Sequence, residues 1–265
     1  MPGPNSISTA QLARLIGTPE APLLLDVRLD EDAEADPFLL PTALPCRAQD
    51  VLRHAHGRPV VVICARGAKL SEGAAALLRA EGTPAEVLEG GHEAWRAAAL
   101  PLVPAALMPQ TALWVTRHRP KIDRIACPWL IRRFIDPRAV FLFVSPAEVE
   151  GVAERFGAMP YDIEGVFWSH RGDLCTFDVL LSEFGLSTPA LERLALIVRG
   201  ADTAQLDLAP ESAGLLAASL GLSRMYSDDL AQLEAGIALY DAFYRWARDA
   251  TDEQHNWPTN SGKSK

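Results

Sequence analysis

The residues with the clearest chemical potential belong to a short loop that begins at Cys64. An apolar run over 59–63 precedes this cysteine and is typical of a buried parallel strand, and the apolar spacing over 70–80 predicts a helix after it. A loop between such a strand and helix directs backbone N–H groups, and the positive end of the helix dipole, toward the sulfur. Both effects favour the thiolate, which is the reactive form of cysteine. We therefore expect Cys64 to act as a nucleophile.

The remaining residues of this loop are suited to holding an anionic substrate beside the sulfur. Gly67 permits a tight turn, and Arg66 and Lys69 bring positive charge. The predicted substrate-binding residues are Ala65, Arg66, Gly67, Ala68 and Lys69. The alternative is that Cys64 is a small buried hydrophobic residue in a domain without catalytic activity.

The other cysteines show no comparable setting. Cys127 precedes Pro128 within a predicted amphipathic helix and is most simply a core residue, and Cys46 lies in no such loop. Four cysteines without a CxxC pair do not form a disulfide framework or a zinc knuckle. This cysteine usage is typical of a reducing compartment, so we expect a cytoplasmic protein.

Three motifs in the first half of the chain together resemble the rhodanese sulfurtransferase domain, over about residues 6–103. They are DVR at 26–28, the loop at 64–69 and LEGGHEAW at 88–95. The resemblance implies that Cys64 accepts a sulfane sulfur as a persulfide and passes it on, with small sulfur donors and acceptor thiols as partners. The six-residue loop has the length that this family uses for sulfur transfer. Lys69 and His92 depart from the family pattern, because these positions more often hold an arginine and an aromatic residue.

The second half of the chain opens with a concentrated basic segment at 117–133. Six basic residues stand there against one acidic residue, a local charge of +5. The segment follows a predicted strand and covers the start of a predicted helix, where backbone donors also favour anions. The predicted oxyanion-binding residues are Arg117, Arg119, Lys121 and Arg124. The alternative is a solvated helix face whose arginines pair with neighbouring acidic residues.

Candidate metal ligands lie further along the chain. His170 is at the end of a predicted strand, and Cys175 and Asp178 are three residues apart at a predicted helix start, where they share a face. Imidazole and carboxylate ligands suit iron or manganese, so His170 and Asp178 are the predicted metal ligands. Further carboxylates near them in sequence, or just past a helix end, are Asp162, Glu164 and Asp202. The spacing matches no standard metal motif, and the alternative is that these residues cap helices or form hydrogen bonds.

Four segments of the second half resemble the C-terminal domain of chromate-resistance ChrB proteins, over about residues 112–249. They are RPKIDRIACPWLIRRFID, DIEGVFWSHRGDLCTFD, IVRGADT and the run from LAPESAGLL to YRWARD. The resemblance implies a role in bacterial chromate resistance and its chromate-responsive regulation. Related proteins linked to superoxide dismutation imply a redox metal at His170 and the carboxylates. Because a rhodanese-like domain stands where the regulators have another N-terminal region, we do not expect nucleic-acid binding.

The elements that must position these residues form two domains of different organisation. Helices and short buried strands alternate over 1–106, which predicts an α/β domain with a parallel sheet flanked by helices. Prolines and a near absence of charge over 97–112 interrupt any helix, and 107–112 is the predicted linker. Residues 113–250 are predicted to form a mostly helical α+β domain, and 251–265 a flexible tail.

Apolar spacing predicts the elements of each domain. In the first domain, helices are predicted at 8–16, 70–80 and 92–98, and strands at 22–27, 59–63 and 85–88. In the second domain, strands are predicted at 113–116, 140–144, 161–163 and 166–170, and helices at 122–135, 176–184, 188–199, 210–222 and 227–249.

Composition excludes several classes of protein. The 265 residues are 49% hydrophobic, which is typical of folded domains, and 25 basic against 34 acidic residues leave a net charge of −9. No run approaches the ~20 apolar residues that span a bilayer, and the first ten residues do not resemble a secretory signal. The acidity argues against nucleic acid as a partner. Apolar-rich helices over 210–249 leave room for a homodimer interface.

We therefore expect a rhodanese-type sulfurtransferase, with Cys64 as the persulfide carrier, coupled to a chromate-resistance domain that acts in oxyanion or oxidative stress. One alternative is a non-enzymatic chromate sensor or regulator, in which both domains bind ligands. The other is a metal-dependent protein that detoxifies superoxide, in which iron or manganese would be the cofactor.

Overall fold

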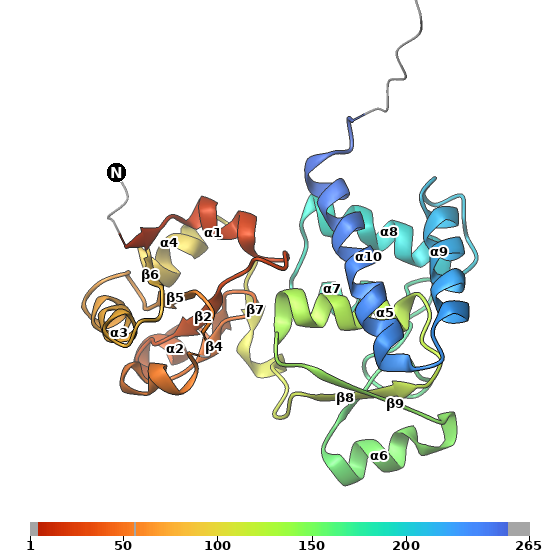
Figure 1. Ribbon diagram of the computed structural model, residues 1–265, viewed down its shortest axis with the longest axis horizontal. Helices are drawn as coiled ribbons and strands as arrows, with labels where there is room; N and C mark the ends of the chain where they lie inside the picture. Colours follow the sequence, from red (N-terminus) through yellow and green to blue (C-terminus); the bar gives the residue numbers. More distant parts are fainter. Residues whose placement is uncertain (1–4, 56, 254–265) are drawn as a thin grey trace, which may run out of the picture.

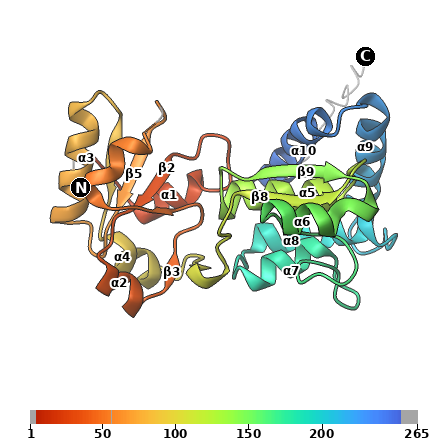
Figure 2. The ribbon, with the colours of Figure 1, turned by 90° about the horizontal axis from the view of Figure 1, so that it is seen from below.

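Two parallel β-sheets, one in each half of the chain, organise the structure (Figure 1). The structure is a computed structural model and describes residues 5–55 and 57–253. Two roughly perpendicular views show the two domains side by side, with the connecting segment between them (Figures 1 and 2). Of the predicted tail at 251–265, the part from residue 254 onward lies outside the described residues.

The first domain is built on a five-stranded sheet in the order β1-β6-β5-β2-β4, and every neighbouring pair is parallel. Its strands are β1 (Ser6–Ile7), β2 (Leu23–Asp26), β4 (Leu44–Pro45), β5 (Val60–Ile63) and β6 (Ala85–Leu88). A short antiparallel pair, β3 (Phe38–Leu39) with β7 (Val103–Pro104), joins the end of the domain to its middle.

The central strand β5 shows how helices cover this sheet. The helical elements are α1 (Thr9–Leu15), α2 (Asp30–Ala35), η1 (Ala48–Arg53), α3 (Lys69–Ala80) and α4 (Gly91–Ala97). All four residues of β5 are buried, as expected of a parallel strand between two helical layers. Val62 packs in the layer that contains α3 and η1, while the next residue, Ile63, packs in the layer that contains α1 and α4. Cys64, the residue after β5, therefore lies where the strand leaves the sheet on the α3 side.

The second domain combines a three-stranded parallel sheet, in the order β10-β8-β9, with a larger helical layer. Its strands are β8 (Leu113–Arg117), β9 (Val140–Val144) and β10 (Met159–Pro160). Its helices are α5 (Asp123–Leu130), α6 (Val149–Phe156), α7 (Thr176–Glu183), α8 (Pro189–Asp202), α9 (Ser212–Met225) and α10 (Asp229–Asp249). Helix α6 lies on the opposite side of the sheet from the other helices (Figure 1). Trp114 of β8 faces the main core, and the next residue, Val115, packs against α6.

The predicted fold class is confirmed: an α/β domain with a parallel sheet precedes a mostly helical α+β domain. Two predicted strands of the second domain, 161–163 and 166–170, are wrong. This segment forms only an isolated bridge between Tyr161 and Trp168. Gly165, with a φ of +85°, turns the chain between them, so the segment is a loop at the edge of the sheet.

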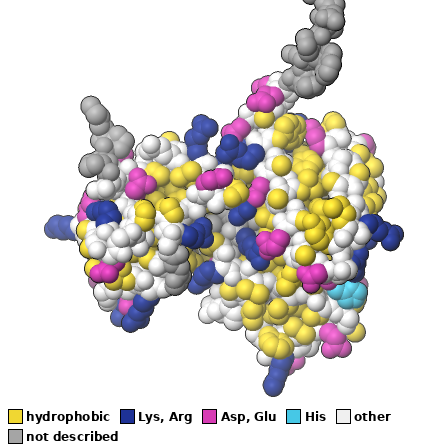
Figure 3. Space-filling model, viewed as in Figure 1, with side chains coloured by type: hydrophobic (Ala, Val, Ile, Leu, Met, Phe, Trp, Pro, Cys, Tyr) yellow, Lys and Arg dark blue, Asp and Glu magenta, His cyan; other side chains and the backbone are white. Residues whose placement is uncertain are grey.

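The two domains share a continuous apolar core. The Thr42 N–H donates to the carbonyl oxygen of Phe134 at 3.2 Å, and the Arg248 guanidinium donates to the carbonyl oxygen of Arg14 at 3.0 Å. An apolar cavity of about 330 Å³ lies between the domains, and Trp95 and Tyr244 line it from the two sides. On the face shown in Figure 3, basic side chains gather along the seam between the domains. Apolar packing and polar contacts thus hold the two domains together.

Within the described part of the chain, no helix is long and apolar enough to cross a bilayer. Helices α9 and α10 cover most of the region predicted to offer a homodimer interface. They expose three large apolar side chains, Leu220, Met225 and Leu230. The homodimer stays a prediction.

We predict that Gly17→Ala weakens the contact between the domains. Gly17 has a φ of +82°, and a Cβ there would lie 2.3 Å from Cζ of Phe134 and 2.9 Å from Cε1 of Tyr244. Backbone strain and overlap should together remove about 3 kcal/mol from the free energy of unfolding, measured with urea. Gly82→Ala is the matched control, because Gly82 has a φ of +78° but no described atom within 4 Å of an added Cβ. It should cost about 1 kcal/mol, and equal losses in both variants would remove Phe134 and Tyr244 from the explanation.

Candidate functional site

Cys64 lies at the carboxyl end of β5, the central strand of the first sheet, and the loop after it leads into α3. Its Sγ atom accepts a hydrogen bond from the Ala68 N–H at 3.3 Å and lies 3.1 Å from the hydroxyl oxygen of Ser71. The residue is buried, with 6% of its surface exposed. The loop and the first turn of α3 therefore surround the sulfur with hydrogen-bond donors.

Burial and hydrogen bonding act on the Cys64 thiol in opposite directions. Burial raises its pKa, whereas the Ser71 hydroxyl and backbone N–H groups of the loop and of Ser71 lower it. The donors prevail, and the pKa of Cys64 lies below the usual thiol value. Cys46 is the opposite case, because burial and two nearby aspartates raise its pKa to about 11. Of these two thiols, Cys64 is the one suited to react as a thiolate.

The turn before α4 clamps the cysteine loop in place. The N–H of His92 donates to the carbonyl oxygen of Cys64, and the N–H of Glu93 donates to that of Ala65, both at 3.0 Å. A Cβ at Gly91 would lie 2.2 Å from the carbonyl oxygen of Cys64, so glycine alone permits this approach. The LEGGHEAW motif is therefore part of the support for the loop.

The predicted substrate-binding loop presents its charges to solvent. Arg66 is exposed and pairs with Glu93 at 2.9 Å, while Lys69 is exposed and forms no ion pair with any residue that the structure describes. Ala65 and Gly67 are half-buried, and Ala68 is exposed. An anion that approaches the loop meets the Arg66 guanidinium, which has a carboxylate partner, and the Lys69 ammonium group, which has no ion-pair partner within residues 5–55 and 57–253.

His92, which departs from the rhodanese pattern, is buried beside the cysteine loop. Its Nε2 atom lies 3.0 Å from the carbonyl oxygen of Phe38, and its Nδ1 atom lies 3.4 Å from Asp36. Burial and the nearby Arg28 guanidinium lower its pKa. The polar ring is thus accommodated in the core through these two contacts.

We predict that Ser71→Ala raises the pKa of Cys64. Either atom of the Cys64–Ser71 contact can donate to the other, but once the thiol is ionised only the Ser71 hydroxyl can, and the substitution deletes this donor. A hydrogen bond to a charged group contributes about 1.5–3 kcal/mol. The midpoint of the pH profile of alkylation by iodoacetamide should therefore rise by about one to two pH units. Peptide mapping by mass spectrometry assigns the reaction to each cysteine, and the profile of Cys46 should not move. An unchanged profile for Cys64 would show that Ser71 does not stabilise the thiolate.

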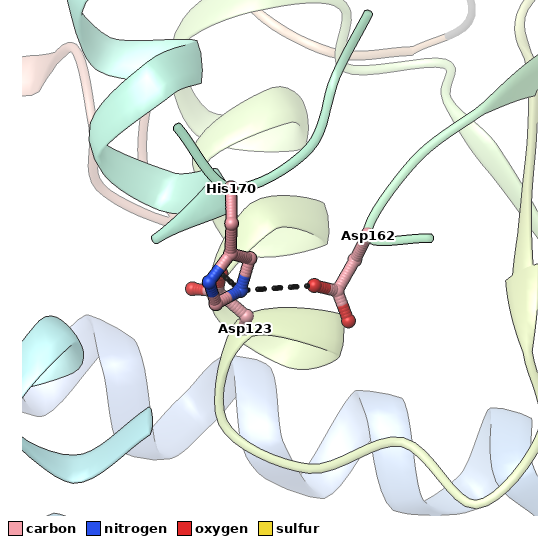
Figure 4. Close-up of side chains that lie close together, drawn as sticks. All are labelled: Asp123, Asp162 and His170. Atoms are coloured by element: carbon pink, nitrogen blue, oxygen red, sulfur yellow. Dashed lines mark ion pairs between the residues drawn. The ribbon is translucent and has the colours of Figure 1, made fainter. Parts of the chain in front are cut away.

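A second group of titratable side chains lies at the carboxyl edge of the second sheet (Figure 4). Asp162 follows β10, Asp123 is the first residue of α5, and His170 lies in the loop before α7. The Nε2 atom of His170 is 3.5 Å from Oδ2 of Asp123 and 3.4 Å from Oδ1 of Asp162. Asp202, the last residue of α8, places a third carboxylate 3.3 Å from the same nitrogen. Both Asp123 and Asp162 are buried, whereas the His170 side chain is 40% exposed.

The charges of this cluster shift one another's protonation. Hydrogen bonds with Asp123 and Asp162 raise the pKa of His170 to about 10, against an opposing effect of burial. Burial and the same two aspartates raise the pKa of Asp202 to about 7. Burial also raises the pKa of Asp123. The His170 imidazole and the carboxylates of Asp123 and Asp202 therefore titrate as one system, in which each of these groups depends on the others.

The structure does not bring Asp178, the second predicted metal ligand, to His170. Its Oδ2 atom accepts hydrogen bonds from the Cys175 N–H at 3.1 Å and from the Cys175 thiol at 3.2 Å. Cys175 and Asp178 together cap the start of α7. For Asp178, the structure therefore matches the alternative in which these residues cap helices. The carboxylates that face His170 are those of Asp123, Asp162 and Asp202.

The four predicted oxyanion-binding residues do not converge on one point. Arg117 donates to the carbonyl oxygen of Asp162 at 3.1 Å, and both Arg117 and Arg124 pair with its carboxylate, at 3.4 and 3.3 Å. Arg119 donates to carbonyl oxygens at the end of α9, and Lys121 is exposed. The other two arginines of the segment form the pairs Arg132–Glu234 and Arg133–Asp241. Most arginines of the basic segment therefore pair with acidic residues, as the alternative for this segment expected.

Asp123 is not among the predicted site residues, because in the sequence it is the single acidic residue of a basic segment. The signal that could reveal it is its position at the start of a helix that follows a parallel strand. Ligand sites in parallel sheets gather at the carboxyl ends of the strands. Asp162, directly after β10 and Tyr161, reaches the same edge for the same reason.

We predict that protonated His170 stabilises the metal-free fold. Its pKa is raised from 6.5 to about 10 in the folded chain. The stabilisation is therefore fully present below about pH 6.5 and is lost as the pH rises through about 10. Urea unfolding in EDTA between these pH values should show a larger loss for the wild type than for His170→Gln. His118→Gln, which changes an exposed histidine, should follow the wild type, and parallel curves for all three proteins would contradict the prediction.

A parallel sheet whose central strand ends in a clamped cysteine loop defines the first domain as rhodanese-like. The family model described as Rhodanese-like domain matches residues 8–98. Among solved structures, a rhodanese-related protein from Thermoplasma volcanium is 23% identical, with 37% of this chain and 97% of that chain covered and a TM-score of 0.33. A thiosulfate sulfurtransferase from Pseudomonas aeruginosa is 26% identical, with 38% of this chain and 19% of that chain covered and a TM-score of 0.32.

The second domain identifies the family of the chain. The family model described as ChrB, C-terminal domain, matches residues 114–247, which is just over half of the sequence, and the chain belongs to this family. Protein ChrB from Cupriavidus metallidurans is 38% identical over 133 residues, which make up 49% of this chain. The match covers 39% of the length of that curated relative.

Proposed function

We propose that the first domain is a sulfurtransferase in which Cys64 carries sulfane sulfur as a persulfide. The observation that supports this most directly is the hydrogen bonding of the Cys64 sulfur by the Ala68 N–H and the Ser71 hydroxyl at the start of α3. These donors stabilise the thiolate, which is the attacking species. A persulfide anion carries its charge on the outer sulfur, and we infer that backbone N–H groups of the same loop stabilise it there.

The proposed reaction has two steps in which atoms and electrons balance. The Cys64 thiolate attacks the outer sulfur of an anionic donor such as thiosulfate; a new sulfur–sulfur bond forms, the donor's own sulfur–sulfur bond breaks, and sulfite leaves with the electron pair. A thiolate or cyanide then attacks the outer sulfur of the persulfide, and the Cys64 thiolate leaves. The exposed charges of Arg66 and Lys69 favour the approach of the anionic donor.

We further propose that this sulfur transfer serves a bacterial response to chromate or a similar oxyanion. Membership of the ChrB C-terminal domain family and the similarity to Protein ChrB support this assignment. Chromate oxidises thiols, so a domain that delivers reduced sulfur to thiols is chemically suited to such a response. All four cysteines are free, in keeping with a reducing compartment, and we assign the reaction to the cytoplasm.

In the second domain, we assign the proposed oxyanion site to a single cavity. It has a volume of about 340 Å³, and Arg117 and His170 line it together with the acidic residues Asp162 and Glu164. The side chain of Arg117 is 42% exposed, which leaves part of its guanidinium available to a ligand. The guanidinium of Arg119, in contrast, donates hydrogen bonds to carbonyl oxygens of the chain itself.

Thiocyanate release tests the proposed sulfur transfer. Wild-type protein incubated with thiosulfate and then freed of it should release stoichiometric thiocyanate when cyanide is added. Cys64→Ser should release none, because no thiolate remains to accept the sulfur. Cys46→Ser is the matched control and should behave as the wild type, since the raised pKa of Cys46 keeps it protonated. Equal release from Cys64→Ser and the wild type would remove Cys64 from the reaction, and a chromate sensor would bind chromate in both proteins while releasing no thiocyanate.

A further inference from the structure

Three side chains of the second domain present ligand atoms close enough to share one cation. One carboxylate oxygen each from Asp123 and Asp162, and one ring nitrogen of His170, all lie within 4.8 Å of one another. The nitrogen–oxygen separations are 3.5 and 3.4 Å. Ligand atoms placed about 2.1 Å from one ion in tetrahedral geometry lie about 3.4 Å apart. The three side chains point toward one another in Figure 4, and the two nitrogen–oxygen separations match those of a coordination sphere.

Asp123 provides an independent observation that points to a ligand. Its side chain is only 1% exposed, and its Oδ2 atom accepts a hydrogen bond from the Thr176 N–H at 2.6 Å. Its Oδ1 atom is buried without a hydrogen-bond partner among the described residues. The thiol of Cys175 is nearby, but its single proton is donated to Asp178. Oδ2 is the oxygen that faces His170, so a cation bound there compensates the charge of this buried carboxylate. An ion that also contacts Oδ1 supplies the partner that this oxygen lacks among the described residues.

The groups around Asp162 orient it and leave one oxygen for a ligand. Oδ2 of Asp162 pairs with Arg117 and Arg124. Oδ1, the oxygen that faces His170, accepts a hydrogen bond from the Thr176 hydroxyl at 3.0 Å. Partners of this kind behind a ligand fix its orientation and tune its affinity for a metal.

We propose that Asp123, Asp162 and His170 bind one divalent d-block metal ion. One imidazole and two carboxylates suit Zn²⁺, Mn²⁺ or Fe²⁺, whereas Ca²⁺ and Mg²⁺ take oxygen ligands and Cu⁺ prefers sulfur. Three protein ligands leave a coordination position open to solvent or a small ligand. The cavity lined by Arg117 and His170 provides the entry path that such a site needs.

The competing arrangement is an ion-pair network without a metal. Asp162 pairs with the guanidinium groups of Arg117 and Arg124, and the carboxylates of Asp123, Asp162 and Asp202 all face His170. Three carboxylates and two guanidinium groups leave one negative charge, so one further positive charge balances the cluster. A proton on His170 supplies that charge in the network. In the proposed site a divalent ion takes the place of the proton and brings two positive charges. The two arrangements differ in whether the cluster binds a metal with defined stoichiometry.

The test uses the full chain, stripped of metal with a chelator and titrated with Co²⁺. The visible d–d absorption of Co²⁺ should saturate at stoichiometric metal, and Zn²⁺ should abolish it by displacement. His170→Gln and Asp123→Asn should each weaken Co²⁺ binding by at least about tenfold, because each removes a ligand. His118→Gln is the matched control, an exposed histidine outside the cluster, and should bind as the wild type.

Two further measurements keep the result decisive if a variant folds poorly. Saturating Zn²⁺ should raise the Tm of the wild type and of His118→Gln, and should leave that of His170→Gln unchanged. In the wild type alone, elemental analysis after removal of free Zn²⁺ should find one equivalent of the metal, which an ion-pair network without a metal does not retain.

The proposed metal site is overturned if the wild type binds neither Co²⁺ nor Zn²⁺ stoichiometrically, or if His170→Gln binds them as well as the wild type does. Either result leaves the ion-pair network as the description of the cluster. Because thiocyanate release depends on Cys64 in the other domain, the metal site and the proposed sulfur transfer can fail independently.

Discussion

Both candidate sites depend on the junction at which a parallel strand ends and a helix begins. Such a junction brings unpaired N–H groups and the positive end of a helix dipole to the carboxyl edge of a sheet. In the first domain, β5 delivers Cys64 to the first turn of α3, where N–H groups and a hydroxyl surround the sulfur. In the second domain, the same edge brings Asp162 after β10 together with Asp123 at the start of α5. The position of each site therefore depends on the strands and helices that meet at its junction.

The sulfur site and the contact between the domains lie on different faces of the first sheet. Cys64 belongs to the apolar layer beneath α3, whereas the opposite layer, with α1 and α4, is continuous with the core of the second domain. Helix α4 connects the two layers: the turn at its start, with Gly91, clamps the cysteine loop, and Trp95 within it lines the cavity between the domains. The loop that carries the sulfur is therefore supported by an element that also contacts the interface.

The parts of the fold that could be predicted are those with a local signature. Strands β2, β5, β6, β8 and β9 are short apolar runs, and the long helices have clear apolar faces, so both were predictable. Strands of two residues, such as β1 and β10, leave no pattern, and α2, whose six residues are acidic or alanine, has no apolar face. The loop at 64–69 is contiguous in sequence and therefore predictable. The cluster around His170 draws on residues from 123 to 202, which only tertiary folding brings together. Asp178, close to His170 in sequence, is instead used in a local cap.

The two sites compensate charge in different ways, and this difference bears on their chemistry. Around Cys64 the stabilising groups in contact with the sulfur are neutral donors, so the sulfur can lose or regain a negative charge without leaving a buried partner ion unpaired. Around His170 the partners are themselves ions, and removal of any one leaves another uncompensated in a buried setting. The first arrangement suits a group whose charge changes in every catalytic cycle. The second suits a cation that stays in place, because burial disfavours the charged form of Asp123 and a cation beside it favours that form.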